Sequence, residues 1–327
     1  MEKRKAILIV NPGSGTRPKD ALPDLVASAL GDETDLLVEA TRQPGDVARI
    51  VAEGLGRATD LFIVAGGDGT VNEAANAISG TPAAMAIIPC GSGNGLARSL
   101  GIPPDFREAA MVAARGRKLT IDRGEANGRP FYCTFGMGFD AAVGHKFAQE
   151  KRRGKMTYLK SAFLEFLNFS SNVYAISIDG NILTERAMVV AVANASQYGN
   201  NAYIAPGASM TDGMLDMTVI HDGNLFQQAL AGVQLMSGHI DKNFLVDTFR
   251  ISGARISRLD DGPAQVDGEI FHPGHVVDIK CRPAALNVIA SPDADRTFIP
   301  IVTPFLSFLR DITTDIRTDL NTLLGKS

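Results

Sequence analysis

The sequence predicts an α/β N-terminal domain with a parallel sheet, followed by a C-terminal domain that is mainly an antiparallel β-sandwich. In the first third of the chain, apolar runs alternate with helical stretches. Beyond about Ile121, short β-like runs follow one another with turn residues between them. The 327 residues also exceed the usual size of one domain. We therefore expect domains over residues 1–121 and 122–290, and a C-terminal segment over 291–327.

The N-terminal elements are marked by three apolar runs that each end in a glycine loop. The runs are "AILIV" (6–10), "LFIVAGG" (61–67) and "AAMAIIPCGSG" (83–93), with helical stretches between them. Strands that alternate with helices form parallel sheets, whose ligands bind beyond the carboxyl ends of the strands. The glycines at these ends are Gly13, Gly15, Gly66, Gly67, Gly69, Gly91, Gly93 and Gly95. We expect one site served by all three loops.

The second domain is predicted from a series of short apolar runs bounded by turn residues. They are "PFYCTFGMG", "YAISIDG", "AMVVAVAN", "MLDMTVI", "FRISGARISRL" and "HVVDIKC", interrupted by one helical segment near residues 140–170. The change near Thr120 is a shift in composition, because no Pro-, Ser- or Gly-rich linker is present there. Residues 304–324 carry apolar side chains at helical spacing, which predicts an amphipathic helix.

Composition argues against several classes of protein. The chain has 32 Lys and Arg against 36 Asp and Glu, a net charge of −4, so we expect no nucleic-acid partner bound through bulk charge. The three cysteines are far apart and odd in number, which favours reduced thiols in a cytosolic protein. The apolar run near the N-terminus is too short for a signal sequence, and no run approaches the ~18 residues of a membrane span. We expect a cytoplasmic protein.

Asp68 stands between glycines in "GGDG", where an acidic side chain is unusual. Glycines after a strand let the backbone approach a phosphate, and the following helix N-terminus favours the anion. An aspartate there would repel phosphate unless Mg²⁺, a substrate proton or a ribose hydroxyl lies between them. Asp68 therefore favours phosphoryl transfer. The alternative is that Asp68 only caps a helix that begins near Thr70.

Seven stretches of the sequence carry a family resemblance. "GGDGTVNEAANAI" from Gly66 and "IPCGSGNGLARSLGIP" from Ile88 resemble the catalytic domain of the diacylglycerol kinase and sphingosine kinase family, in its bacterial soluble lipid-kinase branch. The further stretches are "VNPGSG", "TRQPGDVARI", "IDRGEANGRPFYCTFGMGFDA", "APGASMTDGMLDM" and "VDGEIF". The resemblance implies an N-terminal domain related to the phosphofructokinase and NAD kinase folds, with the active site in the cleft between the domains. It also implies transfer of the γ-phosphate of ATP to a lipid hydroxyl.

The same resemblance implies which residues bind ATP. They are Asn11, Thr41, Gly66, Gly67, Asp68, Gly69, Thr70, Val71, Asn72, Gly91, Ser92 and Asn94. Among them, Asp68 would lie closest to the transferred group.

The resemblance also implies a metal site and a catalytic base. Asp212 would hold Mg²⁺ through its carboxylate, and the carbonyl groups of Ser209 and Met214 would add the oxygen ligands that a hard cation prefers. Glu269 resembles the proton acceptor of the bacterial branch, whereas sphingosine kinases are described with the aspartate equivalent to Asp68 as base. This sequence has both, and we prefer Glu269. Taken alone, Asp212-Gly213 and Asp267-Gly268 would be hairpin turns, but their occurrence in family order favours the site.

Two residues bear on the lipid substrate. Asp122 would recognise a polar lipid head group, as in sphingosine kinases, or would bind only the backbone at a crossover between the domains. At Gly95 the chain departs from the "GTGND" of bacterial diacylglycerol kinases, because it reads "GSGNG". Diacylglycerol, a sphingoid base, ceramide and other hydroxylated lipids therefore all remain candidate substrates.

Two other functions compete with lipid kinase activity. A kinase of the NAD kinase type shares the GGDGT loop, but the Asn72-Glu73 pair and the later "GSGNGLAR" argue against it. A nucleotide-gated lipid-binding protein without turnover is the non-enzyme alternative. Because Asp68, Asp212 and Glu269 are all present, turnover is favoured.

Two segments are candidates for contact with a membrane or a second subunit. A basic cluster lies just before an apolar stretch that reaches Phe166, and its residues are Lys146, Lys151, Arg152, Arg153 and Lys155. It either docks the protein peripherally on an anionic membrane or is a solvated charge run beside a core helix. The apolar stripe from Phe305 to Leu323 packs on its own chain, on a second copy in a homodimer or on a bilayer.

Overall fold

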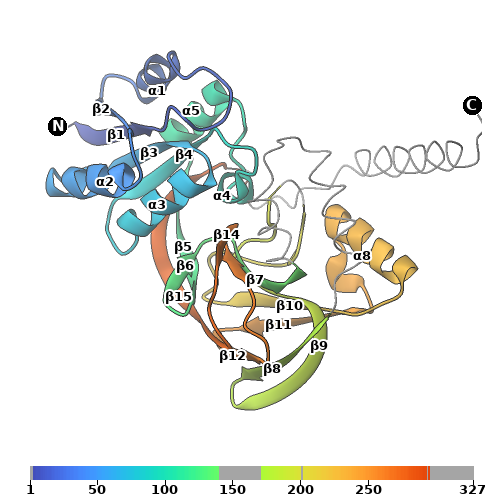
Figure 1. Cartoon of the computed structure of the whole chain (residues 1–327). Coiled ribbons are helices and arrows are strands. Elements are labelled where there is room, and N and C mark those ends of the chain that lie inside the picture. The colour runs from blue at the N-terminus through green and yellow to red at the C-terminus, as the bar shows by residue number, and fades with distance from the viewer. Residues whose placement is uncertain (1–2, 140–170, 200–201, 293, 295–327) are drawn as a thin grey trace, which may run out of the picture.

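The computed structural model describes residues 3–139, 171–199, 202–292 and 294. The N-terminal domain is a three-layer α/β/α unit (Figure 1). Its four strands pair in parallel in the order β4-β3-β1-β2. They are β1 (Arg4–Val10), β2 (Thr34–Ala40), β3 (Leu61–Gly66) and β4 (Ala84–Pro89). The predicted parallel sheet is confirmed.

Five helices connect these strands and lead into the next domain. They are α1 (Leu22–Leu30), α2 (Asp46–Gly56), α3 (Asp68–Ile78), α4 (Gly95–Ser99) and α5 (Phe106–Arg115). Helix α1 packs with α5, and α2 packs with α3 on the other face of the sheet. Every residue of β3 and β4 is buried, because both faces of these central strands are covered by helices.

Strand β1 lies between β2 and β3. The chain therefore goes from β1 to β2 on one side, and then crosses back over β1 to form β3 on the other side. The connections from β1 to β2 and from β3 to β4 therefore run in opposite directions along the sheet. Such a reversal opens a crevice at the carboxyl ends of the strands, where α/β proteins bind ligands. The loops that follow β1 and β3 border this crevice.

The second domain is built from antiparallel strands, as predicted. Its strands are β5 (Arg117–Ala126), β6 (Arg129–Phe131), β7 (Thr134–Gly138), β8 (Asn172–Ile178), β9 (Asn181–Ala193), β10 (Leu215–His221), β11 (Val246–Ile251), β12 (Gly253–Arg258), β13 (Ala264–Val266), β14 (Glu269–Phe271) and β15 (Val276–Ala290). Helix α8 (Leu225–Ser237) and the short 3-10 helix η1 (Ile240–Lys242) follow β10. Helix α8 was not predicted from the sequence; it begins with a capping box at Asn224.

One long strand joins the two domains. Near its end β15 pairs in parallel with β4, at Asn287 and Val288. Over its earlier residues it pairs antiparallel with β12, and it pairs antiparallel with β5 as far as Ala290. Its last residues, including Val288 and Ala290, pack in the core of the N-terminal domain. The expected boundary at 121/122 falls inside β5. The two domains thus share a continuous sheet, and no linker separates them.

Several expectations lie outside the described residues. These are the helical segment near 140–170, the basic cluster from Lys146 to Lys155 and the amphipathic stripe from Phe305 to Leu323. None of the helices that the structure describes is both long and apolar enough to cross a bilayer. Cys90, Cys133 and Cys281 are free thiols.

Candidate functional site

The loops after β1 and β3 are joined by side-chain hydrogen bonds. The Asn11 amide donates to Thr70 Oγ1 at 2.8 Å, and the Gly67 N–H donates to Ser14 Oγ at 3.2 Å. Asn11 directly follows β1, and Gly67 is the N-terminal cap of α3. The first N–H groups of α3, which have no acceptor within the helix, therefore open at the crevice between β1 and β3.

Asp68 joins the loop after β4 to the same place. Its two carboxylate oxygens accept the N–H groups of Asn94 at 2.9 Å and Gly95 at 2.8 Å. Asp68 is the first residue of α3, and no side chain caps this helix, so the capping alternative is wrong. A Cβ at Gly93 would lie 2.8 Å from Asp68 Oδ2, which explains a glycine at that position. Asp68 thus shapes the loop that follows β4.

The loop from Gly91 to Asn94 is closed by its own asparagine. The Asn94 side chain accepts the Gly91 N–H at 3.0 Å and donates to the Gly91 carbonyl at 2.8 Å. Asn94 has the left-handed backbone (φ 51°) that this residue tolerates better than most. Ser92 is exposed at the tip. Of the predicted nucleotide-binding residues, Val71 turns its side chain into the core, so only its backbone can face a ligand.

Two basic residues at this site were not singled out from the sequence. Lys19 Nζ donates to the carbonyl groups of Pro12 (3.3 Å) and Ser14, in the loop after β1. The Arg17 guanidinium donates to the Pro89 carbonyl and lies 3.8 Å from the centre of the Phe106 ring. Their position just after the glycine loop "NPGSG" is the sequence signal that could have identified them as site residues. Lys19 places a positive charge beside the predicted phosphate loops.

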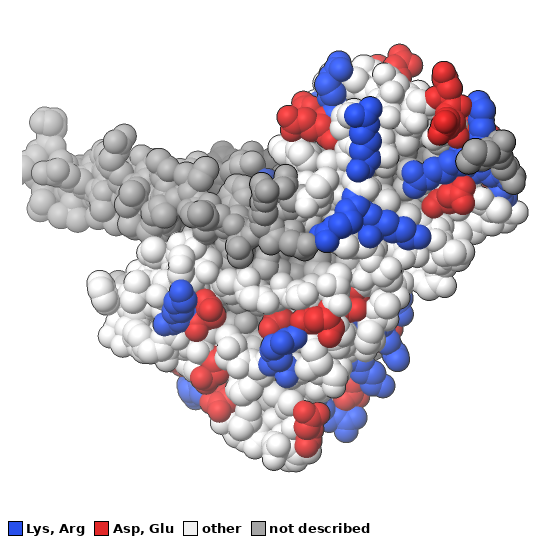
Figure 2. All heavy atoms as spheres, turned by 180° about the vertical axis from the view of Figure 1, so that it is seen from behind, with Lys and Arg blue, Asp and Glu red and all other residues white. Residues whose placement is uncertain are grey.

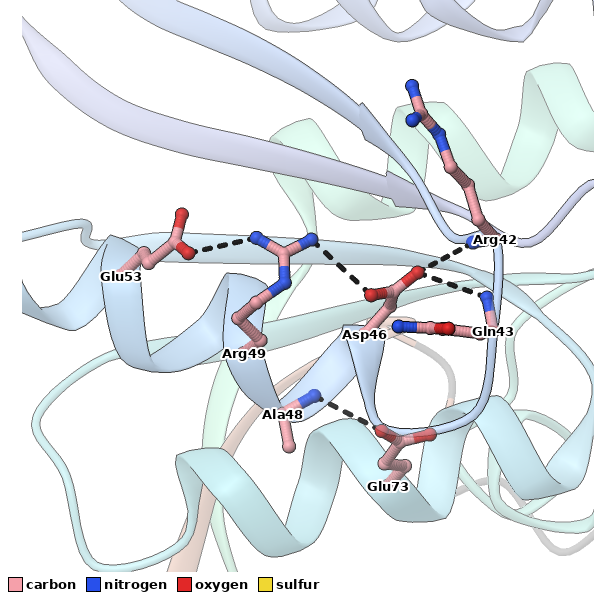
Figure 3. A network of polar contacts seen from close by, with 7 residues as sticks. All are labelled: Arg42, Gln43, Asp46, Ala48, Arg49, Glu53 and Glu73. Atoms are coloured by element: carbon pink, nitrogen blue, oxygen red, sulfur yellow. Dashed lines mark hydrogen bonds and ion pairs between the residues drawn. The ribbon is translucent and has the colours of Figure 1, made fainter.

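The loop after β2 is fixed by carboxylates (Figure 3). Asp46 accepts the N–H groups of Arg42 and Gln43, and these bonds hold the pKa of Asp46 below its ordinary value. Glu73 of α3 accepts the Ala48 N–H in the first turn of α2, at 3.2 Å. Glu73 thereby ties α2 and the loop that begins at Thr41 to α3. From the sequence, Glu73 was only an argument against an NAD kinase, and this structural role was not predicted.

Asp267 and Glu269 lie on the β13–β14 hairpin. Asp267 and Gly268 form its two-residue turn, with φ of 47° and 86°, so this pair is a hairpin turn. Glu269 is exposed at the start of β14, and the described residues offer its carboxylate no hydrogen bond. The Asp267 carboxylate accepts three N–H groups, from Tyr132, Cys133 and Thr134. Burial raises the pKa of Asp267 to about 6; these hydrogen bonds oppose the shift and the nearby Asp68 charge adds to it.

Asp122 is used inside the protein. It is 2% exposed, and its oxygens accept the N–H groups of Gly213 and Ala284, both at 2.7 Å. These bonds join β5 to the loop before β10 and to an irregularity in β15. The geometry matches the alternative in which Asp122 binds backbone at the crossover between the domains.

Of the expected metal ligands, the Asp212 carboxylate is engaged by other groups of the protein. Asp212 accepts the Met214 N–H at 3.0 Å and forms an ion pair with Arg250. The Ser209 hydroxyl lies 3.5 Å from that of Thr211. Within the described ranges, no three His, Cys, Asp or Glu side chains gather as metal ligands. We derive no catalytic step through Mg²⁺ at Ser209, Asp212 and Met214.

An α/β domain with a crevice between β1 and β3, joined through a shared sheet to an antiparallel domain, defines the NAD kinase-like class of fold. An Archaeoglobus fulgidus NAD kinase solved in complex with ATP has this fold, with a TM-score of 0.52 at 12% identity over 91% of this chain and 98% of that one. A diacylglycerol kinase structure from Bacillus anthracis strain Sterne superposes with a TM-score of 0.72 at 23% identity, over 90% and 99% of the two chains.

Family comparisons agree with this fold. The model described as "Diacylglycerol kinase catalytic domain" matches residues 5–126, and the "YegS C-terminal NAD kinase beta sandwich-like domain" matches residues 133–290. The chain therefore belongs to the diacylglycerol kinase catalytic-domain family, in the branch that carries a YegS-type C-terminal domain.

Two relatives cover most of the chain. A protein of Bacillus subtilis (strain 168) named "Diacylglycerol kinase" is 27% identical over 84% of this chain and 94% of its own length. A protein of Pseudomonas fluorescens named "Probable lipid kinase YegS-like" is 27% identical over 90% of this chain and 98% of its own. The family is one of lipid kinases.

Proposed function

We propose that this protein is an ATP-dependent kinase that transfers the γ-phosphate of ATP to the hydroxyl group of a diacylglycerol or sphingoid-type lipid. One observation supports it most: three loops far apart in sequence meet at the crevice between β1 and β3, joined by the Asn11–Thr70, Ser14–Gly67 and Asp68–Gly95 hydrogen bonds. Backbone N–H groups at the start of α3 suit phosphate, and Lys19 adds a positive charge.

Of the two candidate bases, Glu269 is favoured as the proton acceptor, because only the Asp68 carboxylate is engaged by hydrogen bonds from described residues. Both oxygens of Asp68 already accept backbone N–H groups, and protonating this carboxylate would weaken the loop it holds. Glu269 is exposed, and none of the residues that the structure describes donates such a bond to its carboxylate. In the proposed reaction Glu269 takes the proton of the lipid hydroxyl, the oxygen attacks the γ-phosphorus, and ADP leaves. Asp68 acts by holding the phosphate loop. Mg²⁺ enters the proposal as the counter-ion of ATP, with no protein ligand assigned.

A thin-layer assay with labelled ATP tests the proposal. The panel holds diacylglycerol, sphingosine, ceramide and other hydroxylated lipids in detergent, with NAD as a soluble control. Label in a lipid product supports the proposal. Label in NAD alone would identify an NAD kinase, and ATP binding without any labelled product would identify a binding protein without turnover.

Peripheral contact with a membrane belongs to the same proposal, because the substrate is a lipid. On the face drawn in Figure 2, basic and acidic side chains of the described residues are interspersed, so bulk charge gives no reason to expect nucleic acid. Replacing Lys151, Arg152, Arg153 and Lys155 by Gln should abolish sedimentation with anionic vesicles and spare turnover of detergent-dispersed lipid. Unchanged sedimentation would reject this role for the cluster.

A further inference from the structure

Asp68 and Asp267 lie on opposite sides of one contact between the two domains. The Gly95 N–H donates to Asp68, and the Cys133 N–H donates to Asp267, both at 2.8 Å. A Cβ at Gly95 would lie 3.5 Å from Cys133 Sγ, so the backbone of the phosphate loop rests directly against Cys133. On the other side, the Cys133 carbonyl accepts the N–H groups of Asn194 at 2.9 Å and Ala195 at 3.1 Å, which tie this segment to the residues after β9.

The Asp267 carboxylate reaches beyond the pairing of its own hairpin. Strand β13 pairs with β7 up to Val266 and Phe135. Past that pair, Asp267 Oδ1 accepts the N–H groups of Cys133 (2.8 Å) and Thr134 (2.9 Å), and its Oδ2 accepts the Tyr132 N–H at 2.8 Å. Three hydrogen bonds from one carboxylate thus attach the turn to the segment that touches Gly95.

The hairpin also carries Glu269, two residues after Asp267. The turn between them is short and sterically defined, so the orientation of Asp267 sets where β14 begins. In Figure 1 the β14 end of the hairpin lies on the side of the second domain toward the N-terminal domain. A chain of direct contacts therefore runs from the phosphate loop to Glu269.

We propose that Asp267 is a positioning residue, which aligns Glu269 with the phosphate loop through Cys133 and Gly95. The proposal rests on the function proposed above, in which Glu269 is the base. Asp267 does not touch the substrates; it acts through the segment that it binds. Because burial disfavours its charge, the ionised carboxylate is held here at a cost in stability, as is common at functional sites.

A double-mutant cycle tests this role. Asp267→Asn replaces one of the two accepting oxygens by an NH₂ group. At least one of the three N–H groups then faces a donor and loses its hydrogen bond. We expect kcat for lipid phosphorylation to fall on the order of 10- to 100-fold, with the KM for ATP changed by less than about 2-fold. In the Glu269→Gln background the same substitution should lower kcat by less than about 2-fold more, because there is no base left to align. Full, independent loss in both backgrounds, or no loss in either, would overturn the proposal.

A matched control and a second readout keep the test independent of folding and of turnover. Asp278→Asn removes an exposed carboxylate that pairs with Arg255, and it should leave kcat unchanged. Amide hydrogen exchange should show Tyr132, Cys133 and Thr134 protected in the wild type, and the amide that faces the new NH₂ group should exchange faster in Asp267→Asn, with the Asp278→Asn variant like the wild type. Fast exchange of these amides in the wild type would overturn the proposal without any variant. If no lipid is phosphorylated at all, the proposed function fails, while the exchange measurement still decides whether Asp267 holds this segment.

Discussion

Replacing Asp267 by Asn is expected to change how the stability of the protein depends on pH. Burial raises the pKa of Asp267 from the ordinary 3.8 to about 6, against the effect of its three backbone hydrogen bonds. Between about pH 4 and pH 6 the folded protein therefore keeps a proton that the unfolded chain releases. Acid favours the folded state over this range, so this group lowers the free energy of unfolding as the pH rises.

The size of the effect follows from the shift. A difference of about 2.2 pKa units, from 3.8 to about 6, corresponds to about 3 kcal/mol at 1.36 kcal/mol per unit. The contribution is fully present below pH 4, disappears between pH 4 and pH 6, and stays absent above pH 6. Asp46 and Asp278 have lowered pKa values and act in the opposite direction, so only a comparison with Asp267→Asn isolates the contribution of Asp267.

Urea unfolding at a series of pH values from 4 to 8 measures this contribution. The free energy of unfolding of the wild type, minus that of Asp267→Asn, should fall by about 2 kcal/mol between pH 4 and pH 7 and level off above about pH 7, since part of the contribution is already lost at pH 4. A difference that is flat across this range would show that Asp267 has an ordinary pKa. A difference that rises with pH would show that its hydrogen bonds outweigh its burial, and either result would refute the reasoning.

Three further predictions concern the phosphate loops and the base. Glu269→Gln should lower kcat on the order of 100-fold while calorimetry shows ATP affinity retained, and near-normal turnover would reject the assignment. Gly67→Val should strongly weaken ATP binding in the same titration, because a Cβ there lies 3.6 Å from Gly91 Cα and the branched side chain extends into the space between the loops. Asn94→Ala should weaken binding of ATP as well, and effects of the two substitutions that add independently would indicate separate sites. Gly93→Ala should also raise the KM for ATP in steady-state assays, since its Cβ would lie 2.8 Å from Asp68 Oδ2, and an unchanged KM would show that this loop is free to shift.

Elements with a strong local pattern could be predicted from the sequence. Strands β3 and β4 are continuous apolar runs because both of their faces are buried, and each run ends at glycines. Strand β2 was not recognised, because it is an edge strand with exposed Leu37 and Val38 and its sequence does not read as a buried run. The end of β15 was also missed, since its parallel pairing with β4 joins residues about 200 positions apart.

For the candidate site, too, some features could be predicted from the sequence and others could not. The convergence of the glycine loops followed from parallel-sheet geometry, and the structure confirms that these loops meet. The partners of the carboxylates did not follow, because Asp68 binds Gly95 and Asp267 binds Cys133 through contacts that only tertiary folding creates. For Asp122 the sequence left two roles open, and its backbone partners at Gly213 and Ala284 favour the structural role.

The proposed function requires that phosphate moves from ATP to a lipid hydroxyl at this site. Mass spectrometry of lipids extracted after incubation with ATP that carries an isotopically labelled γ-phosphate tests it most directly. We expect the wild type to form a lipid monophosphate that contains the whole labelled phosphoryl group. The Glu269→Gln variant should form this product at a rate lower on the order of 100-fold. Label found only in inorganic phosphate or only in phosphorylated NAD would contradict it.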